Sequence, residues 1–232
     1  MRAWFRWKGV KCTAIGVIAN VLPEITMPLE RVSYTSVPGR SGTLTQTEGE
    51  DVYDDIVLTV ECSVENGKRL GEVMRYLKGA DQVEFSNRPG GFYYARVSNQ
   101  IPFEKILRGR PNRRFAVSFR CKPFWYVSEE ADVEMNEIGW VENEGSVYAE
   151  PIITVRGSGD GVLLVGENMI ELKGMEGEII IDSTLQEVYD AQGESKNACM
   201  TGEFPRLAVG RNEIGWSGGI TGVTIRKNTR YL

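Results

Sequence analysis

One stretch alone in this 232-residue chain has the pattern of an amphipathic helix, and segments with strand patterns lie on both sides of it. Within residues 66–79, four apolar residues recur at the i, i+3, i+4 and i+7 spacing of one helix face: Leu70, Val73, Met74 and Leu77. Asn66 can cap the start, and Gly79 can adopt the left-handed conformation that ends a helix. We therefore predict a helix over residues 66–78. Because a single helix cannot cover its own apolar face, strands must pack against it.

The segments around this helix alternate apolar and polar residues, as half-buried strands do. The alternation is clearest at Ile56, Leu58, Val60 and Cys62, and again at Phe115, Val117, Phe119 and Cys121. Further strands are predicted over residues 2–7, 12–18, 29–37, 83–85 and 92–97. Together these patterns predict an N-terminal domain over residues 1–127, a β-sandwich or barrel-like fold with one α-helix.

The last third of the chain has strand patterns and no helix pattern. Short strands separated by glycine turns are predicted over residues 152–156, 162–165, 169–172, 178–182, 212–216 and 222–226. The run from Gly157 to Gly161 looks like half of a phosphate-binding loop. Because a strand pattern follows it where such a loop needs a helix, we interpret it as a hairpin turn. The spacing predicts a β-sandwich over residues 149–232, so the fold class of the whole chain is mainly β.

Charge is divided unequally along the chain. Residues 1–122 carry 19 Lys and Arg against 13 Asp and Glu, a balance of +6, whereas residues 123–232 carry 8 against 19, a balance of −11. We interpret residues 128–148, which contain no Lys or Arg, as an acidic linker. Trp140 and other apolar residues interrupt this segment, so we expect it to be partly ordered against a surface. The asymmetry favours charge-complementary contacts within or between subunits.

The sequence offers no set of residues for common catalytic chemistry. It contains no histidine, which excludes Ser-His-Asp and Cys-His nucleophilic systems and histidine metal sites. Its four cysteines form no C-x-x-C pair; we interpret them as buried free thiols, with zinc binding or a disulfide as the alternatives. Carboxylate pairs such as Asp54 with Asp55 are expected on the surface. We predict no catalytic residue, no cofactor, no metal site and no enzyme activity.

Hydropathy gives no sign of a membrane partner. The mean hydropathy is −0.26, and no apolar run approaches the roughly 20 residues of a membrane span. The first eight residues lack the apolar core of a secretory signal, so we expect synthesis in a cytoplasm.

Residues 104–122 contain seven Lys and Arg against one Glu, and such a cluster could contact nucleic-acid phosphates. However, Phe115 and Phe119 are in phase with the apolar Val117 and Cys121, so they belong to the core and cannot stack on bases. We predict no specific nucleic-acid binding. A solvated strand face and an interface to an acidic surface are the two interpretations that we keep.

Several pieces of the chain, taken in order, carry a resemblance. In the first half they are residues 37–44, the helix end Tyr76-Leu77-Lys78-Gly79, and residues 83–86, 91–95 and 119–124. In the second half they are residues 150–161, 181–183, 196–197, 200–205 and 212–216. Together they resemble the distal tail protein family of siphovirus-type phages and prophages. One departure is Arg40-Ser41-Gly42, where Arg-Asp-Gly is expected; it concerns only the local turn.

The resemblance implies a structural virion protein without an active site, made in the bacterial host cytoplasm and located in the virion tail. It implies a ring, usually hexameric, at the distal end of a long non-contractile tail. The N-terminal domains would form the ring, and a C-terminal galectin-like β-sandwich would project from it. The implied partners are other copies of the chain, the tail tube protein and the tail-tip hub protein, with a receptor-binding protein or a host surface glycan as a further partner.

Two functional hypotheses follow, a ring subunit and a carbohydrate-binding β-sandwich module or adhesin. Trp140, Tyr148 and Trp216 could form an aromatic sugar platform, although packing in a core or an interface is the alternative for each. For a ring, opposite faces of the subunit must be complementary. We therefore predict an interface containing Arg108, Arg110, Arg113 or Arg114 opposite acidic residues of a neighbour, with apolar burial that includes Trp140 supplying most of the affinity.

Overall fold

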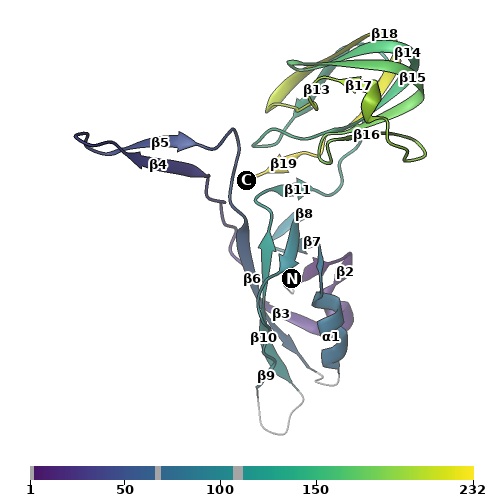
Figure 1. Ribbon diagram of the computed structural model, residues 1–232. Coiled ribbons are helices and arrows are strands. Elements are labelled where there is room, and N and C mark those ends of the chain that lie inside the picture. Colours follow the sequence, from purple (N-terminus) through teal and green to yellow (C-terminus); the bar gives the residue numbers. More distant parts are fainter. Residues whose placement is uncertain (1–2, 66–68, 107–111) are drawn as a thin grey trace. The chain divides into compact units, whose positions relative to one another are not determined.

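The computed structural model describes residues 3–65, 69–106 and 112–232, and the chain divides into two compact units (Figure 1). The first unit comprises Met1–Ser128 together with Leu232, and the second comprises Glu129–Tyr231. Each unit has its own cluster of buried apolar side chains, so each can bury a core without the other.

The first unit is mainly antiparallel sheet. Its elements are β1 (Phe5–Trp7), β2 (Val10–Lys11), a 3₁₀ helix (Cys12–Ile15), β3 (Val17–Val21), β4 (Val32–Ser36), β5 (Thr43–Thr47), β6 (Ile56–Val64), α1 (Leu70–Leu77), β7 (Ala80–Phe85), β8 (Arg88–Val97), β9 (Glu104–Lys105), β10 (Arg113–Cys121) and β11 (Trp125–Val127). The main sheet has the order β2-β1-β7-β8-β10-β6-β3, while β4 and β5 form a separate two-stranded sheet. The predicted mainly-β fold with one helix is confirmed for this unit.

The core of the first unit lies on one face of the main sheet. The alternation predicted for β6 and β10 is confirmed, because Phe115, Val117, Phe119 and Cys121 are buried opposite buried residues of β6. The ring of Phe119 lies 5.6 Å from that of Phe5 and 5.1 Å from that of Trp7, measured between centroids. The alternate residues of β10, from Arg114 to Arg120, therefore form part of the outer face of this sheet.

Helix α1 packs on this core through Val73 and Leu77, which are buried as predicted. The prediction that Met74 lies on the same buried face is wrong, because its side chain is 55% exposed. The helix is turned instead toward Tyr76, whose hydroxyl accepts a hydrogen bond from Trp7 N (3.1 Å) and donates one to Val10 O (2.8 Å). The predicted cap Asn66 lies outside the described residues, and Gly79 follows the helix with φ of 99°.

One strand predicted in this unit is only partly present. Residues 12–18 were expected to be a single strand, but Cys12–Ile15 forms a 3₁₀ helix that ends at Gly16 in the left-handed conformation. Strand β3 begins only at Val17. Cys12 lies in this 3₁₀ helix and is fully buried, so its burial does not come from the alternation of a strand.

The second unit is a curled antiparallel sheet. Its elements are β12 (Val133–Met135), β13 (Gly139–Asn143), β14 (Ile152–Val165), β15 (Asn168–Asp182), β16 (Glu187–Asp190), a 3₁₀ helix (Asn197–Cys199), β17 (Met200–Thr201), β18 (Gly210–Arg226) and β19 (Arg230–Tyr231). The order is β12-β18-β14-β15-β16, with β13 also paired to β18 and β17 to β15. The strands of this sheet, which β19 does not join, enclose the second core, in agreement with the predicted mainly-β sandwich.

The glycine run from Gly157 to Gly161 is not the hairpin turn that was predicted. It lies inside the continuous strand β14, where the register against β18 shifts between Gly157 and Gly161. A Cβ atom on Gly219 would lie 1.7 Å from Ser158 O, so the two backbones approach more closely than a side chain permits. Bulges of this kind make the long, bent strands β14, β15 and β18 look in sequence like twice as many short ones.

The acidic segment over residues 128–148, which was predicted as a linker, instead contains strands of the second sheet. Its strands β12 and β13 pair with β18, and from Glu129 onward the segment belongs to the second unit. Val141 and Asn143 are buried there. The Asn143 side chain donates to Val147 O and Leu207 O, both at 3.0 Å, and accepts from Gly145 N. Glu134 in β12 and Glu142 in β13 occupy exposed alternate positions, so within the strands the charge marks a strand face, whereas Glu130 is half-buried.

The predicted free thiols are confirmed. All four cysteines are unpaired; Cys12, Cys62 and Cys121 are buried in the first core, whereas Cys199 is half-buried in the second unit. Burial raises the pKa of the Cys121 thiol to about 12 and that of Cys62 higher still. Such thiols behave as small apolar side chains.

Candidate functional site

The structure places the predicted interface residues on both units. Arg108 and Arg110 lie outside the described residues. Arg113 begins β10 and is half-buried, with a guanidinium nitrogen donating to Phe103 O at 3.4 Å. Arg114 is exposed on the outer face of the main sheet. Trp140 lies in β13 of the second unit, 52% exposed, with the Arg211 guanidinium 4.2 Å from its ring centroid.

The acidic residues expected opposite these arginines are partly neutralised inside the second unit. Asp132 pairs with Arg226 at 3.0 Å, Glu130 with Lys227 at 3.2 Å, and Glu150 with Arg230 at 2.9 Å. Carboxylates that already have a cation partner gain less from a second one. The predicted pairing of the basic and acidic segments between neighbours stays a prediction.

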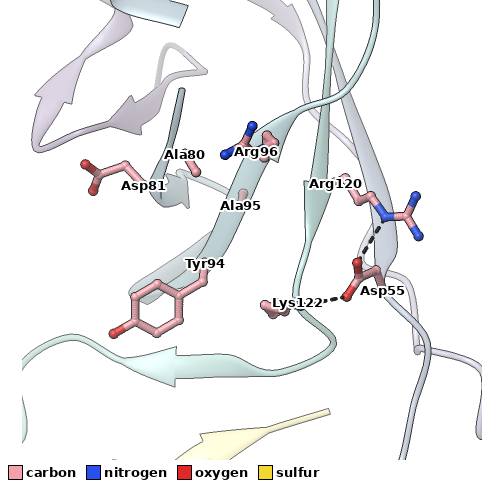
Figure 2. A pocket seen from close by; sticks show the side chains of 8 residues that line it. All are labelled: Asp55, Ala80, Asp81, Tyr94, Ala95, Arg96, Arg120 and Lys122. Atoms are coloured by element: carbon pink, nitrogen blue, oxygen red, sulfur yellow. Dashed lines mark hydrogen bonds and ion pairs between the residues drawn. The ribbon is translucent and has the colours of Figure 1, made fainter. Parts of the chain in front are cut away.

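The outer face of the main sheet carries two hollows of different charge. The first, of 420 Å³, lies over β7, β8 and β10 (Figure 2). It contains three cations, Arg96, Arg120 and Lys122, and two carboxylates, Asp55 and Asp81. Asp55 binds Arg120 at 3.0 Å and Lys122 at 3.6 Å, whereas Arg96 makes no ion pair with any residue that the structure describes. Its surface is therefore locally basic, with the exposed Tyr94 ring beside it.

The second hollow, of 640 Å³, lies near the free edge of the sheet, where β3, β6 and β10 run side by side. It carries the carboxylates of Glu61 and Glu104 and one cation, Arg114, which faces Glu104 in the strand register. Val21, 52% exposed, and Pro102 add apolar surface. This hollow is therefore the more acidic of the two.

The most exposed feature of the first unit is the hairpin of β4 and β5, which we call the arm and define as residues 32–47 (Figure 1). Every residue from 33 to 50 is exposed. Apart from Arg40 at its tip, the arm contains no charged residue. Two of its apolar side chains are largely exposed, Tyr34 at 66% and Leu44 at 44%. Sequence patterns located this hairpin only in part, as a strand over residues 29–37 and a turn.

The base of the arm is firmly held. The Arg31 guanidinium binds Asp54 at 2.8 Å, and Arg31 N donates to Val52 O at 2.9 Å. Asp54 N donates to Leu29 O at 2.8 Å. At the tip, Arg40 N donates to Val37 O, and Gly39 has φ of 78°, as a turn with Pro38 at its second position requires. The chain thus connects the arm to the first unit through backbone hydrogen bonds and one exposed ion pair.

The second unit has a polar hollow of 530 Å³. Its lining mixes carboxylates, amides, a hydroxyl and a guanidinium: Glu150, Asn168, Ser183, Gln186, Glu203 and Arg206. Asp182 fixes the loop that carries Ser183, because its carboxylate accepts hydrogen bonds from Thr184 N and Leu185 N. Such a set of donors and acceptors suits a neutral ligand with several hydroxyl groups.

The aromatic sugar platform is not assembled. The guanidinium groups of Arg206 and Arg230 lie over the Tyr148 ring, 4.5 Å and 4.6 Å from its centroid. Trp216 packs against the core of the second unit, and Trp140 is covered by Arg211. The packing alternative holds for Trp216, whereas Trp140 is 52% exposed and its packing in an interface stays a prediction.

Within residues 3–65, 69–106 and 112–232, no three His, Cys, Asp or Glu side chains gather closely enough to hold a metal ion. Among these same residues, no helix has both the length and the apolar character to cross a bilayer.

The comparisons with known proteins give one clear result, which concerns the fold. The chain matches the crystal structure of SPP1 Dit (gp 19.1) over 100% of both chains, with a TM-score of 0.80 and 13% sequence identity. It has the fold of a phage distal tail protein. The SPP1 protein is described as a paradigm of the hub adsorption apparatus in phages that infect Gram-positive bacteria.

A second structural match points the same way. A chain of the phage p2 baseplate, in its activated conformation with Sr, matches with a TM-score of 0.51 and 8% identity over 97% of this chain and 98% of that one. No family model matches the sequence, and no curated protein matches it. The likeness to phage tail proteins is therefore carried by the fold.

Proposed function

We propose that this chain is a structural component of a phage tail and that it assembles with other copies of itself. The observation that supports this most directly is the match of the whole chain, both units included, to SPP1 Dit. The fully exposed, nearly uncharged arm adds support, because such a surface is what an assembling subunit presents to a neighbour.

In its finer form the proposal is a ring, with six copies expected, at the distal end of a long non-contractile tail. The ring would join the tail tube protein to the tail-tip hub protein and the receptor-binding apparatus. The protein would be made in the host cytoplasm and would reside in the virion tail without an enzymatic role. Arg108, Arg110, Arg113, Arg114 and Trp140 stay predicted interface residues, and the galectin-like character of the second unit stays a prediction.

The test is the size and shape of the purified protein. Light scattering after size-exclusion chromatography should give a mass of several 26.0 kDa subunits, and negative-stain electron microscopy should give closed rings. A protein that is monomeric at every concentration, alone and when mixed with the tail tube and hub proteins, would contradict the proposal.

A second candidate function, carbohydrate binding, is favoured by the polar hollow of the second unit. Its lining can donate hydrogen bonds to the hydroxyl groups of a sugar and accept them, while Phe204 offers an apolar face. The test is calorimetry with cell-wall oligosaccharides, comparing wild type with Glu203→Ala, and with Glu178→Ala as an exposed control outside the hollow. Binding that is lost only in Glu203→Ala would support the module, and no binding by wild type would exclude it for those sugars.

A further inference from the structure

The arm has the features of a surface that another molecule covers. A two-stranded hairpin has little stability in water by itself, and both outer edges of this one offer unpaired N–H and C=O groups. Exposed edges of stable proteins usually carry charges, above all lysine, that prevent further strand pairing. The ten residues of β4 and β5 carry none, in a chain of which 25% is charged. The arm is therefore unprotected against association.

Charge at the tip indicates where the arm can bind. Arg40 is the only charged residue of the arm, and it makes no ion pair with the described part of the chain. A binding site for the tip must therefore supply a carboxylate as well as apolar surface for Val37 and Leu44, which are 36% and 44% exposed.

The two hollows on the main sheet differ in how they would receive such a tip. The 420 Å³ hollow has three cations, Arg96, Arg120 and Lys122, against two carboxylates, Asp55 and Asp81. Asp55 is already paired with Arg120 and Lys122, so the excess positive charge would repel Arg40. The 640 Å³ hollow presents Glu61 and Glu104 with one cation, and it also has the exposed Val21 at its edge. Exposed apolar side chains adjoin both hollows, so it is the net charge that selects the second hollow.

We propose that the tip of the arm, residues 37–44, of one copy docks in the hollow formed by Glu61 and Glu104 of a second copy, where the Arg40 guanidinium binds these carboxylates. This inference rests on the proposed self-assembly. The arm and the hollow are different surfaces of the same subunit, so the contact is heterologous. Repeated in one direction, it leads to a closed ring or a filament rather than to a two-fold dimer.

The experiment is a charge swap, read by light scattering and mass photometry. Arg40→Glu and Glu61→Arg should each shift the wild-type assembly to monomer by at least tenfold in the concentration needed for assembly. Arg40→Glu combined with Glu61→Arg should restore it. Arg75→Glu and Glu72→Arg, which make the same charge changes on exposed positions of α1, should assemble as wild type does. Circular dichroism melts establish that each variant is folded.

The outcomes separate this docking from the proposed function. A wild type that stays monomeric overturns self-assembly and this inference together. A wild type that forms rings while Arg40→Glu and Glu61→Arg form them equally well overturns the docking alone. If each single variant dissociates and the double variant does not recover, Arg40 and Glu61 are not partners, and the docking is likewise overturned.

Discussion

Two antiparallel hairpins of this chain have the same kind of backbone pairing and opposite surroundings. In the hairpin of β14 and β15, alternate side chains such as Val155, Leu163 and Ile170 are fully buried. In the arm, no residue is buried. Backbone hydrogen bonds replace bonds to water and contribute little net stability, so the difference lies in the apolar face. The first hairpin is covered inside the chain, whereas the described part of the chain leaves the arm exposed.

The largest expected effect is a difference in the free energy of unfolding between two matched Leu→Ala truncations. Leu163→Ala, in a position with no exposure, should lower the free energy of unfolding of the second unit by about 2–5 kcal/mol, because it leaves a cavity. Leu44→Ala, in the arm, should change the stability of the monomer by no more than about 0.5 kcal/mol. Urea unfolding followed by tryptophan fluorescence measures both.

The same pair should behave in the opposite way in assembly. Leu44→Ala is expected to weaken association of folded copies, whereas Leu163→Ala should affect it only through loss of folded protein. Equal destabilisation of the monomer by both truncations would mean that the arm is covered within its own chain, and the comparison would fail.

A smaller effect is expected at α1, which, unlike the arm, packs against the core of its own unit. Tyr76→Phe removes the hydroxyl that bonds Trp7 N and Val10 O, and it should cost about 1–3 kcal/mol of stability in the first unit. Tyr34→Phe removes the same atom from the arm, where the side chain is 66% exposed, and should have no measurable effect on the monomer. Thermal unfolding compares the two, and a neutral Tyr76→Phe would show that the helix is held by packing alone.

These contrasts also explain what sequence patterns could and could not predict. Alternation in β6 and β10 was sufficient to define a core face, because a period of two has only two possible phases. The predicted helix face was wrong at Met74, because apolar spacing does not reveal that the hydroxyl of Tyr76 bonds Trp7 N and Val10 O. Glycine bulges hid the length of β14 and β18, because Gly219 and Gly157 serve a close backbone approach in three dimensions.

The candidate site was harder to predict than the fold. Charge runs do not identify interface residues, because alternate residues of a strand face carry charge whether or not they bind anything, as β12 and β13 illustrate. The informative signal was the lack of charge in residues 32–39 and 41–47. It is meaningful only once these residues are known to be exposed, and exposure of a hairpin is a tertiary property that its own sequence does not encode.

Cysteine reactivity tests whether the core of the first unit excludes solvent, in contrast to the exposed arm. Cys199 should react with a thiol reagent at pH 8, whereas Cys12, Cys62 and Cys121 should react only on unfolding, because burial raises their pKa values. Because the pKa of the buried Cys121 thiol is higher in the folded than in the unfolded state, its protonated form contributes stability that is complete below about pH 8.5. This contribution is lost as the pH rises toward about 12. Rapid reaction of all four thiols would contradict a closed core.

The smallest effect is expected at β12, an edge strand that is protected in the way the arm is not. It has three residues, and beside it Asp132 forms two hydrogen bonds with the Arg226 guanidinium, at 3.0 Å and 3.1 Å. These hydrogen bonds hold the pKa of Asp132 below its usual value. The contribution of this ion pair to stability is therefore complete above about pH 4 and is lost as the pH falls through the lowered pKa.

Asp132→Asn should cost less than about 1 kcal/mol at pH 7, because both side chains are exposed, and should flatten the acid limb of the stability curve. It should leave assembly unchanged. If Asp132→Asn instead caused association through the uncovered edge, charge protection at β12 would be shown to matter as much as its absence does in the arm.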